Sequence, residues 1–401
     1  MKVKRVAGEG AHLVVSICVV FTLTMCVLLV GACNRNGKGA IHFASSSATD
    51  DPANSGVAAT SSGPVISYAD VVSRVAPAVV TIHSESRVRA PQQYPFMDDP
   101  FFQNFFGNRG MPPQAELRRH GLGSGVIVTT DGYILTNHHV IDGAEQIKVD
   151  LNDGHTLEAK VVGSDAPSDL AVLKISASSL PVLSLGDSDR VRVGDVALAI
   201  GNPLGIGQTV TMGIISAKGR QTGLSNGSFE DFLQTDAPIN QGNSGGALVS
   251  TASELVGINS QILSPTGGSI GIGFAIPSNM ARIVMDQLIA NGKVRRGQLG
   301  ITIQKITSDV ASKLGIQEGK GVLVAQVQPG GPADKAGLTQ GDIIIAFNGT
   351  AVNDPNSFRN QVASTPPGTA VALTILRNGK QQDLHPTLGE FVPQAEQPRE
   401  G

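Results

Sequence analysis

The chain has 401 residues, 48 of them glycine and 22 proline, and a formal net charge of −3. This length allows two domains, and the near-neutral charge excludes the basic surface that nucleic-acid binding requires. All three cysteines (Cys18, Cys26 and Cys33) stand in the first 33 residues, which excludes disulfides and cysteine-rich zinc sites from the rest of the chain. The eight histidines are scattered apart from one adjacent pair, so we expect no metal site.

The first 64 residues predict export and tethering. Three of the first five residues are basic, and the stretch 13–32 is largely apolar and about long enough to span a bilayer. We therefore expect residues 1–33 to be a signal peptide or membrane anchor, with the following chain outside the cytoplasm. The sequence ending in Cys33 also fits a lipoprotein cleavage box, so lipidation of Cys33, an uncleaved anchor and release after ordinary cleavage all stay open. Residues 34–64 are small and polar, which predicts a flexible linker.

Short apolar runs separated by Gly, Asn and Asp dominate the chain from residue 66 to residue 277, which predicts mostly β structure with tight turns. One short helix is expected over residues 66–72. The expected strands are 78–82, 124–128, 133–136, 146–151, 156–163, 169–175, 196–200, 209–217, 232–236, 247–249, 254–261 and 271–275. Their spacing is typical of barrels or sandwiches, and we assign the strands up to residue 175 to one barrel and the later strands to a second.

The segment 87–120 is expected to be a loop, and its unusual length predicts that it is either functional or mobile. It contains four of the chain's 13 phenylalanines, namely Phe101, Phe102, Phe105 and Phe106. On a polar loop such rings either seek a partner surface or cover their own barrel, and both interpretations stay open.

The first domain is expected to end with a helix. Ser278 is the expected N-cap, Gly292 fits the C-terminal stop, and apolar side chains repeat along one face. These side chains belong to Met280, Ile283, Val284 and Leu288. In the unit that follows, Asn348-Gly349 and Asn378-Gly379 stand between apolar runs and predict two β-hairpins.

A polar turn with the sequence Gln-Gly-Asn-Ser-Gly-Gly carries Ser244 between two expected strands. Its glycines let backbone amides converge beside the hydroxyl, so the amides of Gly242 and Ser244 are the expected oxyanion hole. The turn also fits the G-x-S-x-G nucleophile elbow, but an elbow enzyme needs its histidine after the serine, where only His385 stands. His139 and Asp169 stand before it, which gives the order His, Asp, Ser of the double-barrel serine proteases.

Ser244 is therefore the expected nucleophile, His139 its base and Asp169 the group that orients the base. Two neighbours compete for these roles. Adjacent side chains on a strand or its end point to opposite faces, so only one of His138 and His139 can serve. Asp165 stands four residues before Asp169, but Asp169 directly leads the apolar strand. This chemistry uses side chains and backbone alone, so we expect no cofactor.

Several motifs together resemble the HtrA/Deg family of trypsin-fold serine proteases. They lie at residues 135–140, 168–172, 201–205, 234–240, 242–246 and 271–277. In the family's motif the histidine is the second residue after the Thr-Asn pair, which selects His139. This chain departs from the motif in having His138 where an asparagine is common.

The resemblance covers roughly residues 65–390 and implies a mostly β fold. A chymotrypsin-like double β-barrel serine protease domain is expected over residues 65–292. One α/β PDZ domain is expected over residues 297–390, and a disordered tail over residues 391–401.

The resemblance also implies a specificity pocket shaped by Ile239 and Asn240. No acidic residue stands where a trypsin-like pocket would need one, so we expect cleavage after Val, Ala or Ile. Arg220 would lie on a loop that relays regulation to the active site; the alternative is an ordinary exposed arginine.

In the PDZ domain, Leu299, Gly300 and Ile301 resemble the family's carboxylate-binding loop, whose amides receive the terminal carboxylate of a peptide that adds as a strand. Phe358 and Val362 would line the groove for the peptide's side chains. The alternative is that Leu299 and Ile301 are plain core residues.

The function that the resemblance implies is an endopeptidase of the bacterial periplasm or cell envelope that cuts unfolded or damaged proteins and is regulated by C-terminal peptides. It also implies a homotrimer, with Tyr68 and Phe229 as interface aromatics. Two alternatives stay open: a chaperone-like or peptide-binding protein with minor proteolysis, and a sensor protease of narrow substrate range that is silent until a peptide binds.

Overall fold

The computed structural model describes residues 67–88, 117–202, 207–222, 229–264, 267–308, 311–312 and 320–392. The chain divides into two compact units, residues 1–64 and 65–401, and all described residues belong to the second. The expected anchor and linker, Cys33 and the Phe101–Phe106 loop lie outside the described residues. None of the described helices combines the length and the apolar character needed to cross a membrane.

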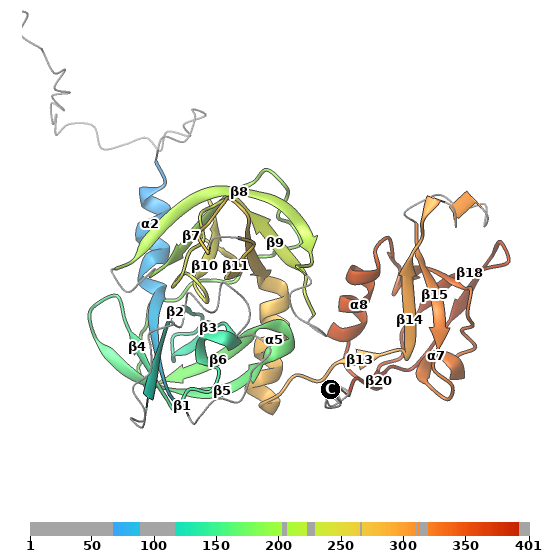
Figure 1. The fold of residues 1–401 in the computed structure, drawn as a ribbon, viewed down its shortest axis with the longest axis horizontal. Coiled ribbons are helices and arrows are strands. Elements are labelled where there is room, and N and C mark those ends of the chain that lie inside the picture. The colour runs from blue at the N-terminus through green and yellow to red at the C-terminus, as the bar shows by residue number, and fades with distance from the viewer. Residues whose placement is uncertain are drawn as a thin grey trace, which may run out of the picture. The chain divides into compact units, whose positions relative to one another are not determined.

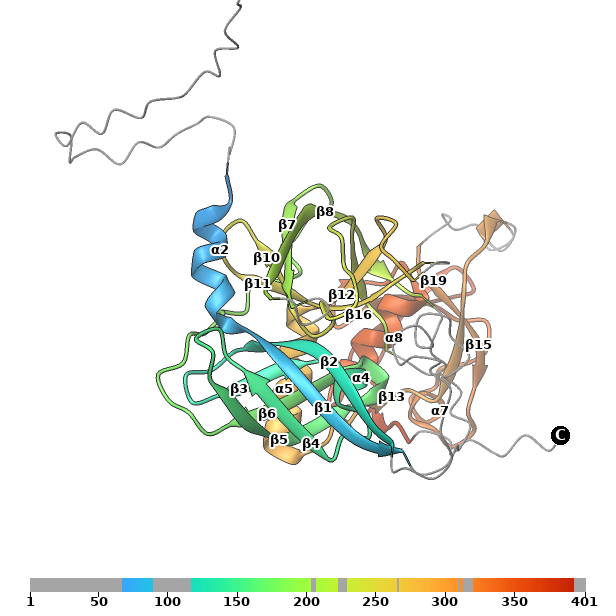
Figure 2. The same cartoon turned by 60° about the vertical axis from the view of Figure 1, so that its left-hand side comes forward.

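The first barrel consists of six antiparallel strands that close in the order β1-β2-β3-β6-β5-β4 (Figure 1). They are β1 (Val79–Val88), β2 (Leu117–Ile127), β3 (Tyr133–Thr136), β4 (Gln146–Asp150), β5 (Thr156–Asp165) and β6 (Leu170–Ile175). Helix α2 (Ala69–Val75), about three residues later than expected, and the 3-10 turn η1 (Ala76–Ala78) lead into β1 (Figure 2). Both β1 and β2 are longer than expected, because their pairing continues to Val88 opposite Leu117.

The second barrel closes in the order β10-β11-β12-β9-β8-β7. Its strands are β7 (Val196–Gly201), β8 (Thr209–Arg220), β9 (Phe232–Thr235), β10 (Ala247–Ser250), β11 (Leu255–Ile262) and β12 (Gly273–Pro277). Each barrel has its own apolar interior, and a third cluster joins side chains of both barrels, among them Leu135 and Leu198. The two barrels therefore share a core.

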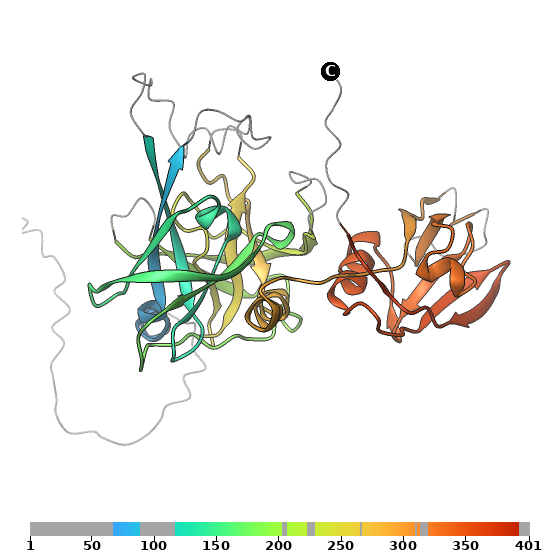
Figure 3. The ribbon, with the colours of Figure 1, turned by 90° about the horizontal axis from the view of Figure 1, so that it is seen from below.

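Helix α5 (Ser278–Asn291) follows β12 and packs against β5 and β6 of the first barrel and β11 of the second (Figure 3). The expected N-cap is wrong by one residue, because Ser278 is the first helical residue and its hydroxyl donates to the Gly186 carbonyl at 2.8 Å. Gly292 has φ 69° and ends the helix as expected. The buried face also differs: Ala281, Val284, Met285 and Leu288 are buried, whereas Ile283 is 40% exposed.

The last domain has a sheet with the strand order β14-β15-β16-β18-β19, in which β17 pairs with β16, and a separate β13–β20 pair. The strands are β13 (Gly297–Gln298), β14 (Ile301–Lys305), β15 (Val322–Val327), β16 (Ile343–Phe347), β17 (Thr350–Ala351), β18 (Leu373–Arg377), β19 (Lys380–Leu384) and β20 (Gly389–Glu390). Its helices are α7 (Pro332–Lys335) and α8 (Pro355–Ser364).

Both expected hairpins of this domain are present. Asn348 and Gly349 join β16 to β17 with φ values of 49° and 80°, and Asn378 and Gly379 join β18 to β19 with 51° and 74°. Positive φ at both central residues is the requirement of a type I′ turn, which the Asn-Gly pairs satisfy.

Candidate active site

The expected catalytic residues come from both barrels. His139 lies in the one-turn helix α4 (His138–Ile141) after β3, and Asp169 lies between the 3-10 turn η2 (Ala166–Ser168) and β6. Because β3 pairs with β6, with Thr136 opposite Ala171, the two residues are brought side by side. Ser244 lies on the turn between β9 and β10 of the second barrel.

His139 and Asp169 form a hydrogen-bonded pair. The Nδ1 atom of His139 lies 2.9 Å from both carboxylate oxygens of Asp169, and the His139 amide donates to Oδ1 at 3.1 Å. Burial lowers the pKa of His139, but the charge and hydrogen bond of Asp169 outweigh it and hold that pKa above its usual value. For Asp169 the effect of burial is the opposite and raises the pKa. The charge and hydrogen bonds of His139 and a bond from Ser260 outweigh it and hold the pKa of Asp169 below its usual value.

Ser260, on β11, connects this pair to the expected nucleophile. Its hydroxyl donates to Asp169 Oδ2 at 2.7 Å, and its carbonyl accepts the hydroxyl of Ser244 at 3.0 Å. Ser244 is 5% exposed and Ser260 1%. The three expected catalytic residues therefore belong to one network. Nothing in the residue pattern of β11 distinguishes Ser260 from the other polar positions of this strand.

The turn around Ser244 leaves two amides available. The amides of Asn243, Gly245 and Gly246 each donate to a backbone carbonyl. Within the described ranges, the amides of Gly242 and Ser244 donate to no acceptor. Two such N–H groups beside a serine hydroxyl have the chemistry required to bind an oxyanion.

The competing residues have other partners. His138 Nδ1 lies 2.5 Å from Ser164 Oγ. Asp165 forms a buried ion pair with Arg296, with distances of 2.8 and 2.5 Å. The two histidines lie on a helical turn, not at a strand end as expected, but successive side chains on a helix also diverge, by about 100°. Of the two histidines only His139 contacts Asp169 through its side chain.

The residues expected to shape specificity lie just before the turn around Ser244, and the residue expected to act in regulation lies at the end of β8. Ile239 is 1% exposed and packs in the core of the second barrel. Asn240 is exposed, and its side chain accepts the Ser269 amide at 3.0 Å. Arg220 ends β8 and donates to Gln234 Oε1 at 3.0 Å, in an exposed position.

The five residues expected to bind a peptide line one groove of about 1050 Å³ in the last domain. Leu299, Gly300 and Ile301 come from the entry to β14, and Phe358 and Val362 come from α8. Leu299 and Phe358 are also buried in the core of this domain. Since β14 is an edge strand of the sheet, the groove lies beside backbone groups to which a peptide strand can be added.

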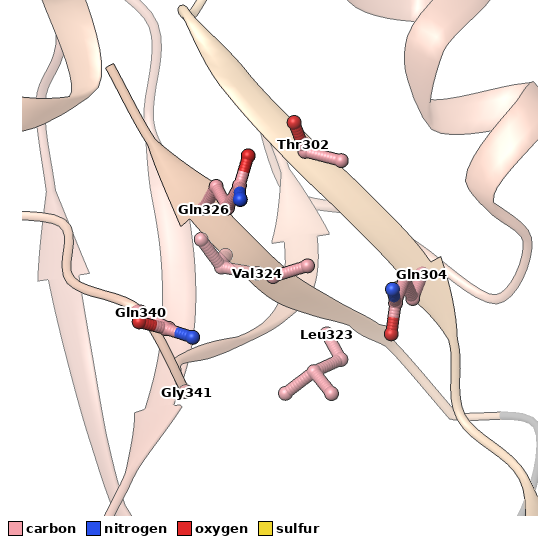
Figure 4. A pocket seen from close by; sticks show the side chains of 8 residues that line it. Thr302, Gln304, Leu323, Val324, Gln326, Gln340 and Gly341 are labelled. Atoms are coloured by element: carbon pink, nitrogen blue, oxygen red, sulfur yellow. The ribbon is translucent and has the colours of Figure 1, made fainter.

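A smaller cavity of about 420 Å³ lies on β14 and β15 and is lined by uncharged side chains, among them Thr302, Gln304, Gln326 and Gln340 (Figure 4). Neither cavity includes the expected catalytic residues. In the part of the chain that the structure describes, no group of three or more His, Cys, Asp and Glu side chains could hold a metal ion.

Helix α8, which lines the groove, also bonds to the segment before β9. Asn356 and Asn360 both donate to the carbonyl of Glu230, at 2.8 and 2.7 Å, and Gln221 donates to the Asn356 side chain at 2.5 Å. The groove and the segment that follows Arg220 are thus linked through one helix.

The aromatic residues expected at a trimer interface have contacts within the chain. Tyr68 packs against the apolar cluster that the barrels share. The ring of Phe229 lies 4.5 Å from the guanidinium of Arg296 and edge-on to Phe391, with the ring centroids 5.6 Å apart.

Two protein-family models match the chain. A trypsin-like peptidase domain matches residues 123–258, and a PDZ domain matches residues 297–388. The expected fold class, a double-barrel protease domain followed by one PDZ domain, is confirmed.

Relatives and solved structures agree with these models. The periplasmic pH-dependent serine endoprotease DegQ of Escherichia coli is 47% identical over 327 residues, covering 81% of this chain and 70% of the relative. A probable periplasmic serine protease of Haemophilus influenzae, described as do/HhoA-like, is 46% identical and covers 79% of this chain and 70% of its own. The HtrA-type protease AlgW, solved with a tripeptide, is 46% identical with a TM-score of 0.66 and covers 82% of this chain and 98% of that one. AlgW with a decapeptide is 49% identical with a TM-score of 0.64, and it covers 82% of this chain and 100% of that one.

Proposed function

This chain belongs to the HtrA/Deg family of trypsin-like serine proteases, and from that premise we propose that it is an extracytoplasmic serine endopeptidase that cuts unfolded or damaged polypeptides. The observation that carries the proposal is the network through Ser260 that joins His139 and Asp169 to Ser244, beside two amides with no acceptor among the described residues. Periplasmic relatives support an extracytoplasmic location.

In the proposed reaction His139 accepts the proton of Ser244 while the serine oxygen attacks the carbonyl carbon, and then gives that proton to the leaving amine as the C–N bond breaks. The hydroxyl first turns from the Ser260 carbonyl to His139 Nε2. Asp169 fixes the tautomer of His139 through Nδ1 and offsets the positive charge of the imidazolium. Water repeats the sequence on the acyl-enzyme and releases the acid product.

The amides of Gly242 and Ser244 would receive the negative oxygen of the tetrahedral intermediate. A donor of this kind contributes roughly 3 to 4 kcal/mol to the transition state, because it is already oriented when the charge develops. Cleavage after Val, Ala or Ile would follow from a pocket shaped by Ile239 and Asn240. Ile239 is buried in the core of the second barrel, and the exposed Asn240 is tied to the facing loop by its bond to Ser269.

Peptides ending in an apolar residue with a free carboxylate would bind in the PDZ groove, with the carboxylate on the loop from Leu299 to Ile301. The similar protease AlgW has been solved with a tripeptide and with a decapeptide, which supports peptide binding by this chain. The bonds from α8 to Glu230 and Gln221 would carry the effect toward the protease domain, with Arg220 on the same path.

The assembly and attachment of the protein form part of the proposal. Residues 65–292 would be the protease domain and residues 297–390 the PDZ domain, with a homotrimer formed through the protease domains near Tyr68 and Phe229. The chain would be held at the membrane by a lipid on Cys33 or by an uncleaved N-terminal helix.

The test uses the full chain and its Ser244→Ala variant with an unfolded, disulfide-free model protein, with and without a peptide that ends in valine. We expect cleavage by the parent chain, at bonds after Val, Ala or Ile, and none by the variant. Cleavage without peptide supports a general quality-control protease, and cleavage that appears only with peptide supports a peptide-activated sensor. If no Ser244-dependent cleavage occurs under either condition, the chaperone-like alternative replaces the protease.

A further inference from the structure

Ser124, in β2 of the first barrel, has bonds to both sides of the oxyanion turn in the second barrel. It is 0% exposed. Its hydroxyl donates to the Gly242 carbonyl at 2.6 Å, and its amide donates to the Ser244 carbonyl at 2.8 Å. The same hydroxyl accepts the Asn202 amide at 2.9 Å, and the Ser124 carbonyl accepts the hydroxyl of Thr136 at 2.7 Å. Every polar group of this residue is therefore bonded.

The bonds to Ser124 complete the fixation of the turn. The peptide group between Gly242 and Asn243 is held at both ends, its carbonyl by Ser124 and its N–H by the Asn240 carbonyl at 3.0 Å. The Ser124 amide also holds the carbonyl of Ser244. The N–H of the same peptide group belongs to Gly245 and donates to the Asn259 carbonyl at 2.8 Å. The Gly242 amide directly precedes the first of these fixed peptide groups, and the Ser244 amide lies between the two.

The packing around Ser124 leaves little room for the turn to move. A Cβ atom placed on Gly245 would lie 2.1 Å from the Ser124 carbonyl oxygen, and one on Gly246 would lie 3.2 Å from the Ser124 Cβ. The glycines on the C-terminal side of Ser244 thus permit the close approach of the two barrels at this point.

We propose that Ser124 is a positioning residue for the oxyanion hole, an inference that rests on the proposed serine protease activity. Ser124 touches neither substrate nor the reacting atoms. Its hydroxyl fixes the peptide group that lies between the two oxyanion donors in the chain. Without that bond the peptide can rotate, and the Gly242 and Ser244 amides no longer converge on the negative oxygen. Because Ser124 belongs to the first barrel, the way in which the two barrels pack against each other sets the geometry of the oxyanion hole.

The experiment compares Ser124→Ala with Ser278→Ala in the full chain. Ser278 is the matched control, since it is also 0% exposed and its hydroxyl donates to a backbone carbonyl, that of Gly186, at 2.8 Å. We expect a similar decrease of Tm in the two variants. For a chromogenic peptide with valine before the scissile bond, we expect Ser124→Ala to lower kcat about 10- to 100-fold with KM unchanged, below the loss from removing a donor outright. Ser278→Ala should leave kcat unchanged.

A second measurement reports on the hole itself. A peptide aldehyde forms a tetrahedral adduct whose oxygen occupies the oxyanion hole, whereas the corresponding peptide alcohol forms none. Ser124→Ala should weaken inhibition by the aldehyde by the same factor as kcat and leave inhibition by the alcohol unchanged. Thr136→Val removes the hydroxyl that bonds to the Ser124 carbonyl and so loosens Ser124. It should lower kcat and aldehyde inhibition together by a smaller factor, and it replaces Ser124→Ala in the test if that variant does not fold.

The outcomes separate this inference from the proposed function. A parent chain without Ser244-dependent cleavage overturns both. Two results would overturn the role of Ser124 alone when the parent chain cleaves and Ser124→Ala folds. One is a kcat of Ser124→Ala within about twofold of the parent value, and the other is an equal loss of aldehyde and alcohol binding.

Discussion

At the scale of single residues, Asp169 combines a strained backbone with two bonds that hold it in place. Its φ of 54° lies in the left-handed region, which costs an ordinary residue roughly 1 to 2 kcal/mol and aspartate less. Its carbonyl accepts the side-chain amide of Asn137 at 2.9 Å and the backbone amide of His138 at 3.2 Å. The same short segment that supplies His139 therefore also holds the backbone of Asp169, whose carboxylate bonds to the His139 ring.

Asp169→Asn should change the pH profile as well as the rate. His139 has a raised pKa and must be neutral to accept a proton, so activity of the parent chain is lost as the pH falls through that raised value. Asparagine removes the charge that opposes the effect of burial, so the acid limb of kcat/KM should move to lower pH. The rate itself should fall by about 10⁴-fold, because asparagine favours the wrong tautomer. The profile of kcat/KM against pH measures both effects, and an acid limb that stays in place would contradict the assignment of Asp169.

Residue types, chain order and family motifs indicated His139, Asp169 and Ser244, and the structure places them in one network. Ser260 and Ser124 could not be found in this way. Ser260 lies 91 positions from Asp169, and Ser124 lies 118 positions from Gly242, so their bonds exist only once the barrels have closed and packed together. A buried serine on a strand gives no local signal of a partner so distant in the chain.

At the scale of secondary-structure elements, apolar alternation located the strands but not all of their ends. The first residues of β2 include Arg118 and His120, whose polarity predicts a loop, yet they pair with β1 as the ladder continues. The N-cap of α5 was missed for a similar reason, since the Ser278 hydroxyl bonds to Gly186 and not to its own helix. Tertiary pairing outweighed local propensity in both places.

The turn η2, which leads to Asp169, depends on the ion pair between Asp165 and Arg296. Asp165 caps the turn by accepting the Ser168 amide at 3.0 Å, and its carboxylate is neutralised by Arg296, which is 7% exposed. Arg296→Met leaves a buried carboxylate without its partner and should lower the free energy of unfolding by about 3 to 5 kcal/mol.

The double variant Arg296→Met with Asp165→Asn removes that charge while keeping a side-chain oxygen for the cap. We expect the double variant to regain most of the free energy of unfolding that Arg296→Met loses. Urea unfolding of the parent chain, both single variants and the double variant measures this. Losses that simply add in the double variant would show that the two residues do not act as a pair.

At the scale of the whole molecule, proteolysis and peptide binding are assigned to separate sites, so one can be changed without the other. Gly300 has φ 72°, and a Cβ atom there would lie 3.2 Å from Gln328 Oε1, so Gly300→Ala strains the expected carboxylate-binding loop. We expect it to weaken a fluorescent peptide ending in valine about 10-fold, since roughly 1 to 2 kcal/mol of strain falls on the bound loop. Gly379→Ala is the matched control, with φ 74° in the β18–β19 hairpin and open space around its Cβ position.

Fluorescence anisotropy of the labelled peptide measures this difference, and cleavage without peptide should be equal in both glycine variants. Equal affinities in Gly300→Ala and Gly379→Ala would remove Gly300 from the binding site.

The closed barrels limit the ways in which this protein can aggregate with the unfolded or damaged polypeptides that it is proposed to cut. A sheet edge offers unpaired N–H and C=O groups on which another chain can extend the sheet. Both barrels close on themselves, although β2 pairs with β3 only at Val126 and Ile127 and has β1 as its one partner strand over residues 117–125. The catalytic part therefore offers a misfolded chain less free edge than an open sheet does, and the β1–β2 hairpin is where a described edge is left. In the proposed PDZ groove a captured strand would add at β14 as a single segment.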